Sequence, residues 1–410
     1  MKLNLRQNWT FFSSLLIATG IATNASSVKA LNFNLNYDPE IDSRALAGFQ
    51  EAASIWESVL SDDITVNLDI GFGSLDPGIL GGAVPETVGA TYSNFANALT
   101  ADATSSNDAI AIANLPEIQS SGGFTFVGTE DDGTLEIVDG RDETTGSLTL
   151  GSDNTNLDVS RANAKALGLL SGTDAGTDAS ITFSSDFASD FDFDQSDGIT
   201  TGKIDFIGVA LHEMGHSLGF VSGVDVVDFV VDFNLNNDPA VTGRNDFDLD
   251  GFRVFSPLDM YRHSDLSVAV SDDAGFPLLD LSVEGKAGSD NVIYDGVSYD
   301  AEPYISIDGG NTSLFAEGNG LFSTGRNLGD GNQASHWKDD LGIGLLDPTI
   351  APGELGMLTD EDVRAFDVMG YDLSASASVP FEFSPGLGLL LVGGAYTFRR
   401  LKKQKSGFKQ

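Results

Sequence analysis

Three residues near the middle of the chain have the types and the spacing of a catalytic metal site. His212, Glu213 and His216 form the pattern H-E-x-x-H. On a helix, side chains four positions apart lie on one face about one turn apart, so both imidazoles can bind one zinc ion. Glu213 then lies near the open coordination position, where its carboxylate can deprotonate water. The motif therefore predicts a zinc site with a general base.

The residues around the motif predict the helix that it requires. Residues 203–218 carry apolar side chains at helical spacing, and Gly219 follows them. Glycine readily adopts the left-handed conformation that ends many helices. Helix periodicity, ligand spacing and a stop signal thus agree over one stretch.

The motif leaves the third zinc ligand open. A catalytic zinc usually has three protein ligands and one position for water. The chain has no cysteine, so no thiolate can serve, and its other two histidines are His263 and His336. Imidazole and carboxylate groups are the remaining ligand types. The candidates are His336, His263, and carboxylates such as Asp225 and Asp228.

The motif resembles that of the metzincin clan of zinc peptidases. His212, Glu213, His216 and Gly219 match its H-E-x-x-H-x-x-G core, but Ser222 stands where the compact form of the clan has its third histidine. The leishmanolysin-like branch inserts a long segment before a third histidine that is followed by tryptophan. His336-Trp337 matches that pattern, and the resemblance therefore favours His336 over His263.

The likeness extends to other parts of the chain. It is strong over residues 205–224 and 335–372 and looser over 31–82; residues 208–223 and the PLDMYR segment also resemble secreted bacterial metalloproteases. Leu346 stands where the branch has the methionine of its Met-turn, a hydrophobic floor under the metal. Met260 and Met357 are other candidates for that role.

The resemblance implies a fold and an activity. It implies an α+β, metzincin-like zinc peptidase with an N-terminal α/β subdomain (a twisted mixed sheet plus helices) and an irregular C-terminal subdomain. It implies a monomeric endopeptidase that hydrolyses peptides or proteins with Glu213 as the base. A strand at residues 181–183, before the motif helix, would pair with the substrate.

Composition narrows the choice of partners. The chain has 410 residues and a formal net charge of −40, so it repels nucleic acid. Asp246, Asp248, Asp250 and Gly251 form D-x-D-x-D-G, the first half of a calcium loop, but Pro257 replaces the glutamate expected at its twelfth position. A Ca²⁺ site and a solvated acidic loop are the two interpretations. An inactive or calcium-binding surface or matrix protein, like an adhesin, is the alternative function.

Hydrophobic periodicity predicts the elements that position the motif. Strands are expected at 31–37, 63–72, 122–127 and 179–184, and helices at 42–60, 91–100, 163–168 and 358–369. The region after Gly223 is predicted to be an acidic loop. We expect one catalytic domain at 31–373, with subdomains at 31–223 and 224–373.

Both ends of the chain are predicted to be export signals. Residues 1–30 have a basic start, an apolar run and a small-residue cleavage site at Val28-Lys29-Ala30. A linker at 374–378 precedes residues 379–410, which resemble a sorting segment of the PEP-CTERM type with PFE in place of PEP. That resemblance implies a membrane transpeptidase as partner and an extracellular or cell-surface location. Membrane anchors at either end are the alternative interpretation.

Overall fold

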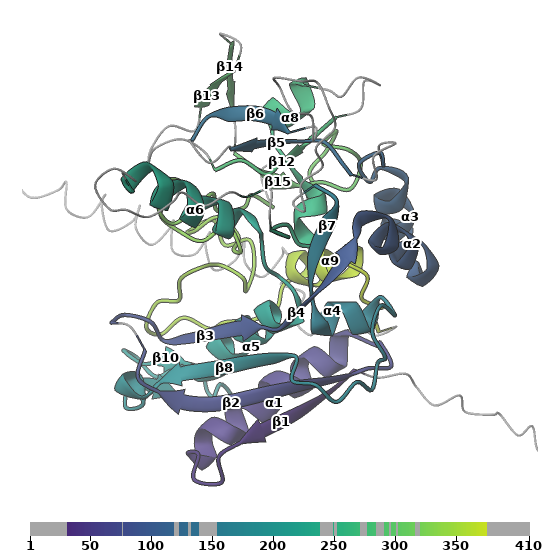
Figure 1. Cartoon of the computed structure of the whole chain (residues 1–410). Coiled ribbons are helices and arrows are strands. Elements are labelled where there is room, and N and C mark those ends of the chain that lie inside the picture. The colour runs from purple at the N-terminus through teal and green to yellow at the C-terminus, as the bar shows by residue number, and fades with distance from the viewer. Residues whose placement is uncertain are drawn as a thin grey trace, which may run out of the picture.

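The computed structural model describes most of the region between the two predicted signals (Figure 1). Its fold is mixed α and β. Within the described part, no helix is long and apolar enough to cross a membrane. The described residues are 31–75, 77–118, 123–129, 133–138, 154–237, 249, 252–270, 277–283, 291–294, 297–300, 302–315 and 320–374.

A four-stranded sheet forms the lower half of the molecule in Figure 1. Its order is β1 (Asn32–Tyr37), β2 (Thr65–Gly73), β8 (Ala179–Ser184) and β3 (Gly81–Pro85). The first three strands run parallel, and β3 pairs antiparallel with β8 at the edge. The strands predicted at 31–37, 63–72 and 179–184 are confirmed.

Two long helices, α1 (Ser43–Val59) and α5 (Phe206–Leu218), pack together against this sheet. Their interface buries Phe49 of α1 against Phe183 of β8 and Phe206 of α5, with ring centroids 4.5 to 5.3 Å apart. Trp56 Nε1 donates to the carbonyl oxygen of Leu211 at 3.0 Å. The apolar stripe of α1 thereby fixes the helix that carries the motif.

The ends of α5 follow from two residues. Asp205 caps the helix, and its Oδ1 accepts from Gly208 N at 3.0 Å. Gly219 ends it with φ of 118°, as predicted. The predicted start at residue 203 was too early, because β10 (Ile204–Asp205) pairs with β9 (Phe191–Asp192) there.

Smaller elements complete the part of the chain before α5, and one further helix lies near the C-terminal end of the described residues. The helices predicted at 91–100, 163–168 and 358–369 are confirmed within a few residues. The elements are β4 (Thr87–Thr91), α2 (Tyr92–Asp102), α3 (Ser106–Ala113), β7 (Asn156–Ser160), α4 (Arg161–Ala166), η1 (Ser185–Phe187) and α9 (Asp360–Val368).

The upper half in Figure 1 is built from short strands, loops and helices. Strand β5 (Phe126–Thr129), which overlaps the prediction at 122–127, pairs with β6 (Leu135–Val138) and with β12 (Leu279–Asp280). Strands from both sides of position 223, the predicted boundary between the subdomains, therefore belong to one sheet. The remaining elements are η3 (Leu258–Tyr261), β11 (Arg262–His263), α8 (Asp265–Ala269), β13 (Asn291–Tyr294), β14 (Val297–Asp300) and β15 (Tyr304–Ile305).

One predicted loop is a helix. The expectation of an acidic loop after Gly223 was wrong, because residues Val224–Asn236 form α6. Valines 224, 227, 230 and 231 lie on its buried side, whereas Val226 and Phe229 are exposed. Apolar residues on both sides obscured the helical period. The spacing of Asp225, Asp228 and Asp232 was the overlooked signal, since three and four positions define one helix face.

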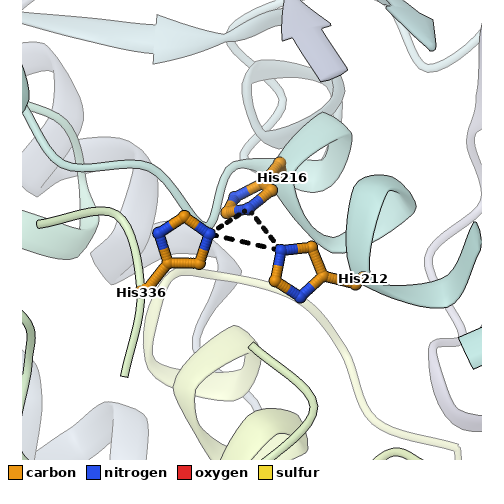
Figure 2. A group of neighbouring side chains, drawn as sticks. All are labelled: His212, His216 and His336. Carbon is orange, nitrogen blue, oxygen red and sulfur yellow. Dashed lines mark hydrogen bonds between the residues drawn. The ribbon is translucent and has the colours of Figure 1, made fainter. Parts of the chain in front are cut away.

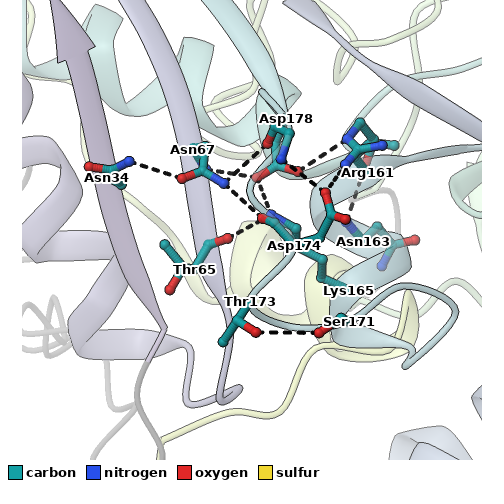
Figure 3. A network of polar contacts seen from close by, with 12 residues as sticks. Asn34, Thr65, Asn67, Arg161, Asn163, Lys165, Ser171, Thr173, Asp174 and Asp178 are labelled. Atoms are coloured by element: carbon teal, nitrogen blue, oxygen red, sulfur yellow. Dashed lines mark hydrogen bonds and ion pairs between the residues drawn. The ribbon is translucent and has the colours of Figure 1, made fainter.

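A buried ion pair connects α4 to the sheet (Figure 3). Lys165 Nζ lies 2.5 Å from Asp178 Oδ2 and donates to Thr65 O at 2.8 Å, and both charged side chains are fully buried. The same carboxylate oxygen accepts from Asn67 N at 2.7 Å. Arg161 contacts Asp174 and lies 3.6 Å from the other oxygen of Asp178. This network connects β2 to the start of β8.

Several sequence predictions fall outside the described residues. The signal peptide at 1–30, the sorting segment at 379–410 and most of the linker at 374–378 lie there. So do Asp246, Asp248 and Asp250 of the half calcium loop. These remain predictions from sequence.

Candidate metal centre

Three imidazoles from two distant parts of the chain converge (Figure 2). The Nε2 atoms of His212 and His216 lie 3.0 Å apart, those of His216 and His336 3.2 Å, and those of His212 and His336 3.3 Å. Within the described part of the chain, this is the one group of three or more His, Cys, Asp or Glu side chains that could hold a metal ion.

The outer nitrogen of each ring is held by a backbone carbonyl. His212 Nδ1 lies 2.9 Å from Leu345 O, His216 Nδ1 2.7 Å from Phe220 O, and His336 Nδ1 3.2 Å from Gln333 O. A carbonyl oxygen only accepts, so each Nδ1 carries the proton. All three Nε2 lone pairs then point at one another. Three lone pairs that face one another repel unless a cation lies between them. The tautomer with the proton on Nδ1 is also the one that leaves Nε2 free to bind a metal.

Burial keeps these rings neutral. Desolvation lowers the pKa of His216 to about 3, with the neighbouring His212 adding to the effect. Burial also lowers the pKa of His212 and takes that of His336 well below its usual range. Neutral imidazole is the form that binds a metal, so no ring has to lose a proton before a cation can bind.

His336 reaches the group from a tightly held segment. Ser323 N donates to the carbonyl oxygen of His336 at 3.0 Å, and Trp337 N donates to that of Leu346 at 2.9 Å. The indole of Trp337 is fully buried against Phe220, and its Nε1 donates to Asp362 at 2.8 Å. The tryptophan next to the third histidine thus serves as its anchor in the core.

Glu213 is buried beside the histidines. Desolvation raises its pKa to about 8, and a hydrogen bond from the backbone of Ala83 acts in the opposite direction. A divalent cation nearby would favour the carboxylate and lower that pKa. The carboxyl group lies in the wall of the same cleft as the three imidazoles. Its environment suits a group that takes up and returns a proton.

Leu346 lies against the motif helix, in the region of the predicted Met-turn. It is fully buried, and a methyl group added at Gly215 would lie 3.1 Å from its Cδ1. Asp362 of α9 accepts hydrogen bonds from Leu345 N at 2.7 Å and Leu346 N at 3.4 Å. The sequence did not identify Asp362 as the residue that holds this turn. Met260 is buried elsewhere in the core, and Met357 lines the cleft.

The other candidate ligands are not in the group. His263 is buried in β11, where its Nδ1 lies 2.9 Å from Leu278 O. Asp225 and Asp228 accept hydrogen bonds from the backbone that precedes His336. Ser222 donates its hydroxyl to Asp259 at 2.5 Å. The two aspartates contact the third-histidine segment rather than the metal position.

The histidines open into a cleft of about 1660 Å³. Its walls include Gly81, Gly82 and Ala83 of β3, as well as residues 347–350 and 354–361. The expectation that the strand at residues 181–183 pairs with substrate was wrong, because β8 is already paired with β2 and β3 on its two sides. Of the two edge strands, β3 is the one that lines the cleft, and among the described residues no strand pairs with its outer side. It has weak strand propensity and was not predicted.

The orientation of β3 follows from one hydrogen bond. Leu80 O accepts from Ser184 N at 2.9 Å, so Leu80 faces β8. Alternate residues of an antiparallel edge strand direct their N–H and C=O away from the partner. Gly81 and Ala83 therefore direct their backbone groups away from β8, and Ala83 directs its N–H toward Glu213.

No family model, curated protein or solved structure matches this chain. The assignment of a function therefore depends on the site itself. The described residues provide three neutral imidazoles, a buried carboxyl group and an open cleft. Such an arrangement can bind a metal ion and transfer a proton next to it.

Proposed function

We propose that this protein is an exported zinc-dependent endopeptidase with a metzincin-like catalytic domain. The observation that carries the proposal is the convergence of three Nε2 atoms beside the buried Glu213 in one cleft. Structural zinc sites are usually closed by four protein ligands, whereas catalytic ones keep an open position. Here three protein ligands face a cleft, which favours catalysis.

The spacing of the imidazoles supports zinc. Bonds of about 2.0–2.1 Å at tetrahedral angles require nitrogens about 3.3–3.4 Å apart. The Nε2 separations of 3.0 to 3.3 Å need only small side-chain shifts to meet that requirement. When bound, the ion supplies Lewis acidity, polarising a carbonyl group and lowering the pKa of water. His212, His216 and His336 would hold it.

The chain's own residues then carry out the proton transfers. Glu213 accepts a proton from the attacking water and returns it to the amine that leaves. Its buried position keeps bulk water from competing for that proton. Asp205, Asp362 and the three carbonyl groups on the Nδ1 atoms hold the helix and the rings in place.

The free edge of β3 supports a peptide as substrate. An extended peptide placed along β3 would bond to the backbone groups of Gly81 and to the carbonyl oxygen of Ala83 as an added strand, while Ala83 N–H stays with Glu213. Such pairing recognises the main chain, so it suits hydrolysis of many sequences. The scissile bond would lie next to Glu213, because Ala83 already contacts that carboxyl group.

Export and sorting are part of the proposal. Cleavage after Ala30 would begin the mature protein at Leu31, whose side chain is buried beside the first strand. A membrane transpeptidase would act on the segment at 379–410. N-terminal sequencing and intact mass of protein from the medium and the membrane test both cleavages: a start at Leu31 is expected, and an uncleaved N-terminus would contradict it.

The deciding experiment measures zinc content and casein cleavage of the purified protein. We expect about one zinc per chain and cleavage that stops on chelation. Glu213→Ala should keep the zinc and lose cleavage by about 10²-fold or more, whereas the exposed Glu51→Ala on α1 should change neither. Full activity of Glu213→Ala would overturn the peptidase proposal.

The same assay separates the alternatives. A surface protein with a structural metal would contain zinc and cleave nothing. A calcium-dependent adhesin would show a melting temperature that rises with Ca²⁺ and would also cleave nothing. A wild-type protein without proteolytic activity would therefore favour one of these two classes.

A further inference from the structure

Asp225, in the first turn of α6, holds the two residues that precede His336. Its Oδ1 accepts from Ala334 N at 2.6 Å, and its Oδ2 accepts from Ser335 N at 3.2 Å and from the Ser335 hydroxyl. The partners lie more than a hundred positions along the chain. One carboxylate thus accepts from two backbone N–H groups and one hydroxyl in the turn that leads directly into the third histidine.

The same turn is tied to the end of the motif helix. Ser335 Oγ accepts from Ser222 N at 2.8 Å. Asp259 in turn accepts from the Ser222 hydroxyl at 2.5 Å and from Gly223 N at 2.8 Å. Since Ser222 follows α5 closely, Ser335 connects the segment of His336 with the helix of His212 and His216.

A second carboxylate of α6 holds the other end of the loop at residues 325–335. Asp228 accepts from Asn327 N and Leu328 N, both at 2.8 Å. Within the loop, Gly325 N donates to Asn332 O at 3.1 Å and Gly331 N donates to Gly325 O at 3.0 Å. The loop is therefore held by hydrogen bonds within itself and by hydrogen bonds to α6.

We propose that Asp225 is a positioning residue that sets metal affinity by holding His336 over the other two histidines, with Asp228 supporting the same loop from its far end. The proposal rests on the ligand set of the proposed function. A histidine on a mobile loop loses conformational freedom when it binds metal, and this entropy loss weakens the affinity. A loop that is already fixed loses less. Outer partners of metal ligands typically account for 10- to 100-fold in affinity.

Asparagine at position 225 tests the acceptor role with little change of shape. Its amide nitrogen donates and cannot accept, so one of the donors at Ala334 and Ser335 would lose its partner. Asp232→Asn is the matched control, because this aspartate lies on the same helix and, within the described part of the chain, its carboxylate accepts from Asn236, four positions on, rather than from the loop before His336. Ser335→Ala is the milder second variant, since it removes only the hydroxyl connection.

The experiment measures zinc affinity of the full chain by competition with a chelator, together with the visible spectrum of the Co²⁺ form. We expect Asp225→Asn to weaken zinc binding by about 10- to 100-fold and to alter the cobalt spectrum. Ser335→Ala should act in the same direction but less, and Asp232→Asn should match the wild type. The melting temperature of the metal-free protein identifies a variant that fails to fold, in which case Ser335→Ala decides.

A double variant shows whether Asp225 acts through His336. In a His336→Ala background, adding Asp225→Asn should change zinc affinity by less than about twofold, because the histidine that it positions is gone. An equal loss in both backgrounds would mean a general structural role and would overturn the inference. So would unchanged affinity in both Asp225→Asn and Ser335→Ala. Neither result depends on peptide cleavage, so an inactive protein that shows the expected affinities would remove the peptidase proposal alone.

Discussion

His216 and His336 are 120 positions apart in the chain, and their Nε2 atoms lie 3.2 Å from each other. One comes from the helix α5, and the other comes from a loop that is supported by α6. A metal ion bound by both histidines would therefore connect the helix α5 to this loop. A free energy of binding gained there adds to the stability of the whole domain.

The first prediction separates the two histidines outside the motif. His336→Ala should lose zinc, with affinity falling by on the order of 100-fold or more, since the loss of a ligand exceeds that of an outer partner. His263→Ala should keep full zinc occupancy and melt at a lower temperature, because it leaves a cavity beside Leu278 O. Metal analysis after dialysis distinguishes them. Retained zinc in His336→Ala would contradict the proposed ligand set.

Local signals made half of this site predictable. The apolar period predicted over residues 203–218 and the stop at Gly219 are contained in one short stretch, whereas the cap at Asp205 that starts the helix at Phe206 was not predicted. Local propensity and pattern agree there, so the element is specified by its own sequence. That His336 lies next to His212 and His216 was predicted from a resemblance and from the small number of histidines, not from any local pattern.

The remaining half depends on partners that are distant in sequence. Strand β3 contains Gly81, Gly82 and Pro85, which have weak strand propensity, and it forms because β8 offers an unpaired edge. Helix α6 exposes Phe229 while it buries Val230 and Val231, which blurs its period. Asp225 finds its donors only after the chain has folded. Such contacts are set by tertiary structure and leave little trace in a single sequence.

A second prediction concerns the buried ion pair of Lys165 and Asp178. Lys165→Met should lower the free energy of unfolding by about 3–5 kcal/mol, because it removes the closest cation of a fully buried carboxylate and leaves only Arg161, at 3.6 Å from its other oxygen. Arg253→Met breaks the exposed pair with Asp158 and should cost at most about 1 kcal/mol. Urea denaturation at pH 7 measures both. Equal, small losses would show that the pair is solvated in solution.

A third prediction follows from Asp62. Burial raises the pKa of this carboxyl group to about 7, with the nearby Asp372 and Asp102 contributing, although Asp372 N donates to it. In the unfolded chain an aspartate has a pKa of about 3.9. The folded protein therefore binds the proton more tightly than the unfolded chain does. The stability that this provides is complete below about pH 4 and is lost as the pH rises toward 7.

Asp62→Asn should remove that dependence while it keeps an acceptor for Asp372 N. We expect the variant to gain stability over the wild type by roughly 2–3 kcal/mol more at pH 8 than at pH 5. Urea denaturation at both pH values gives the difference. A gain that does not change with pH would mean that Asp62 is ionised in the folded protein throughout this range.

The last prediction uses the alternation of β3. Ala83→Pro removes the N–H that faces Glu213 but no hydrogen bond to β8, because Ala83 directs its backbone away from that strand. Val84→Pro removes an N–H that faces β8, since Val84 has the same orientation as Leu80.

If β3 orients the general base and pairs with a peptide, Ala83→Pro should lower kcat/KM by about 10- to 100-fold, which corresponds to one hydrogen bond to a charged group. Its melting temperature should stay near that of the wild type. Val84→Pro should instead lower the melting temperature, because it breaks the sheet ladder. Casein cleavage and thermal melting, measured on both variants, separate the two roles: full activity in Ala83→Pro would show that Glu213 does not depend on the Ala83 N–H.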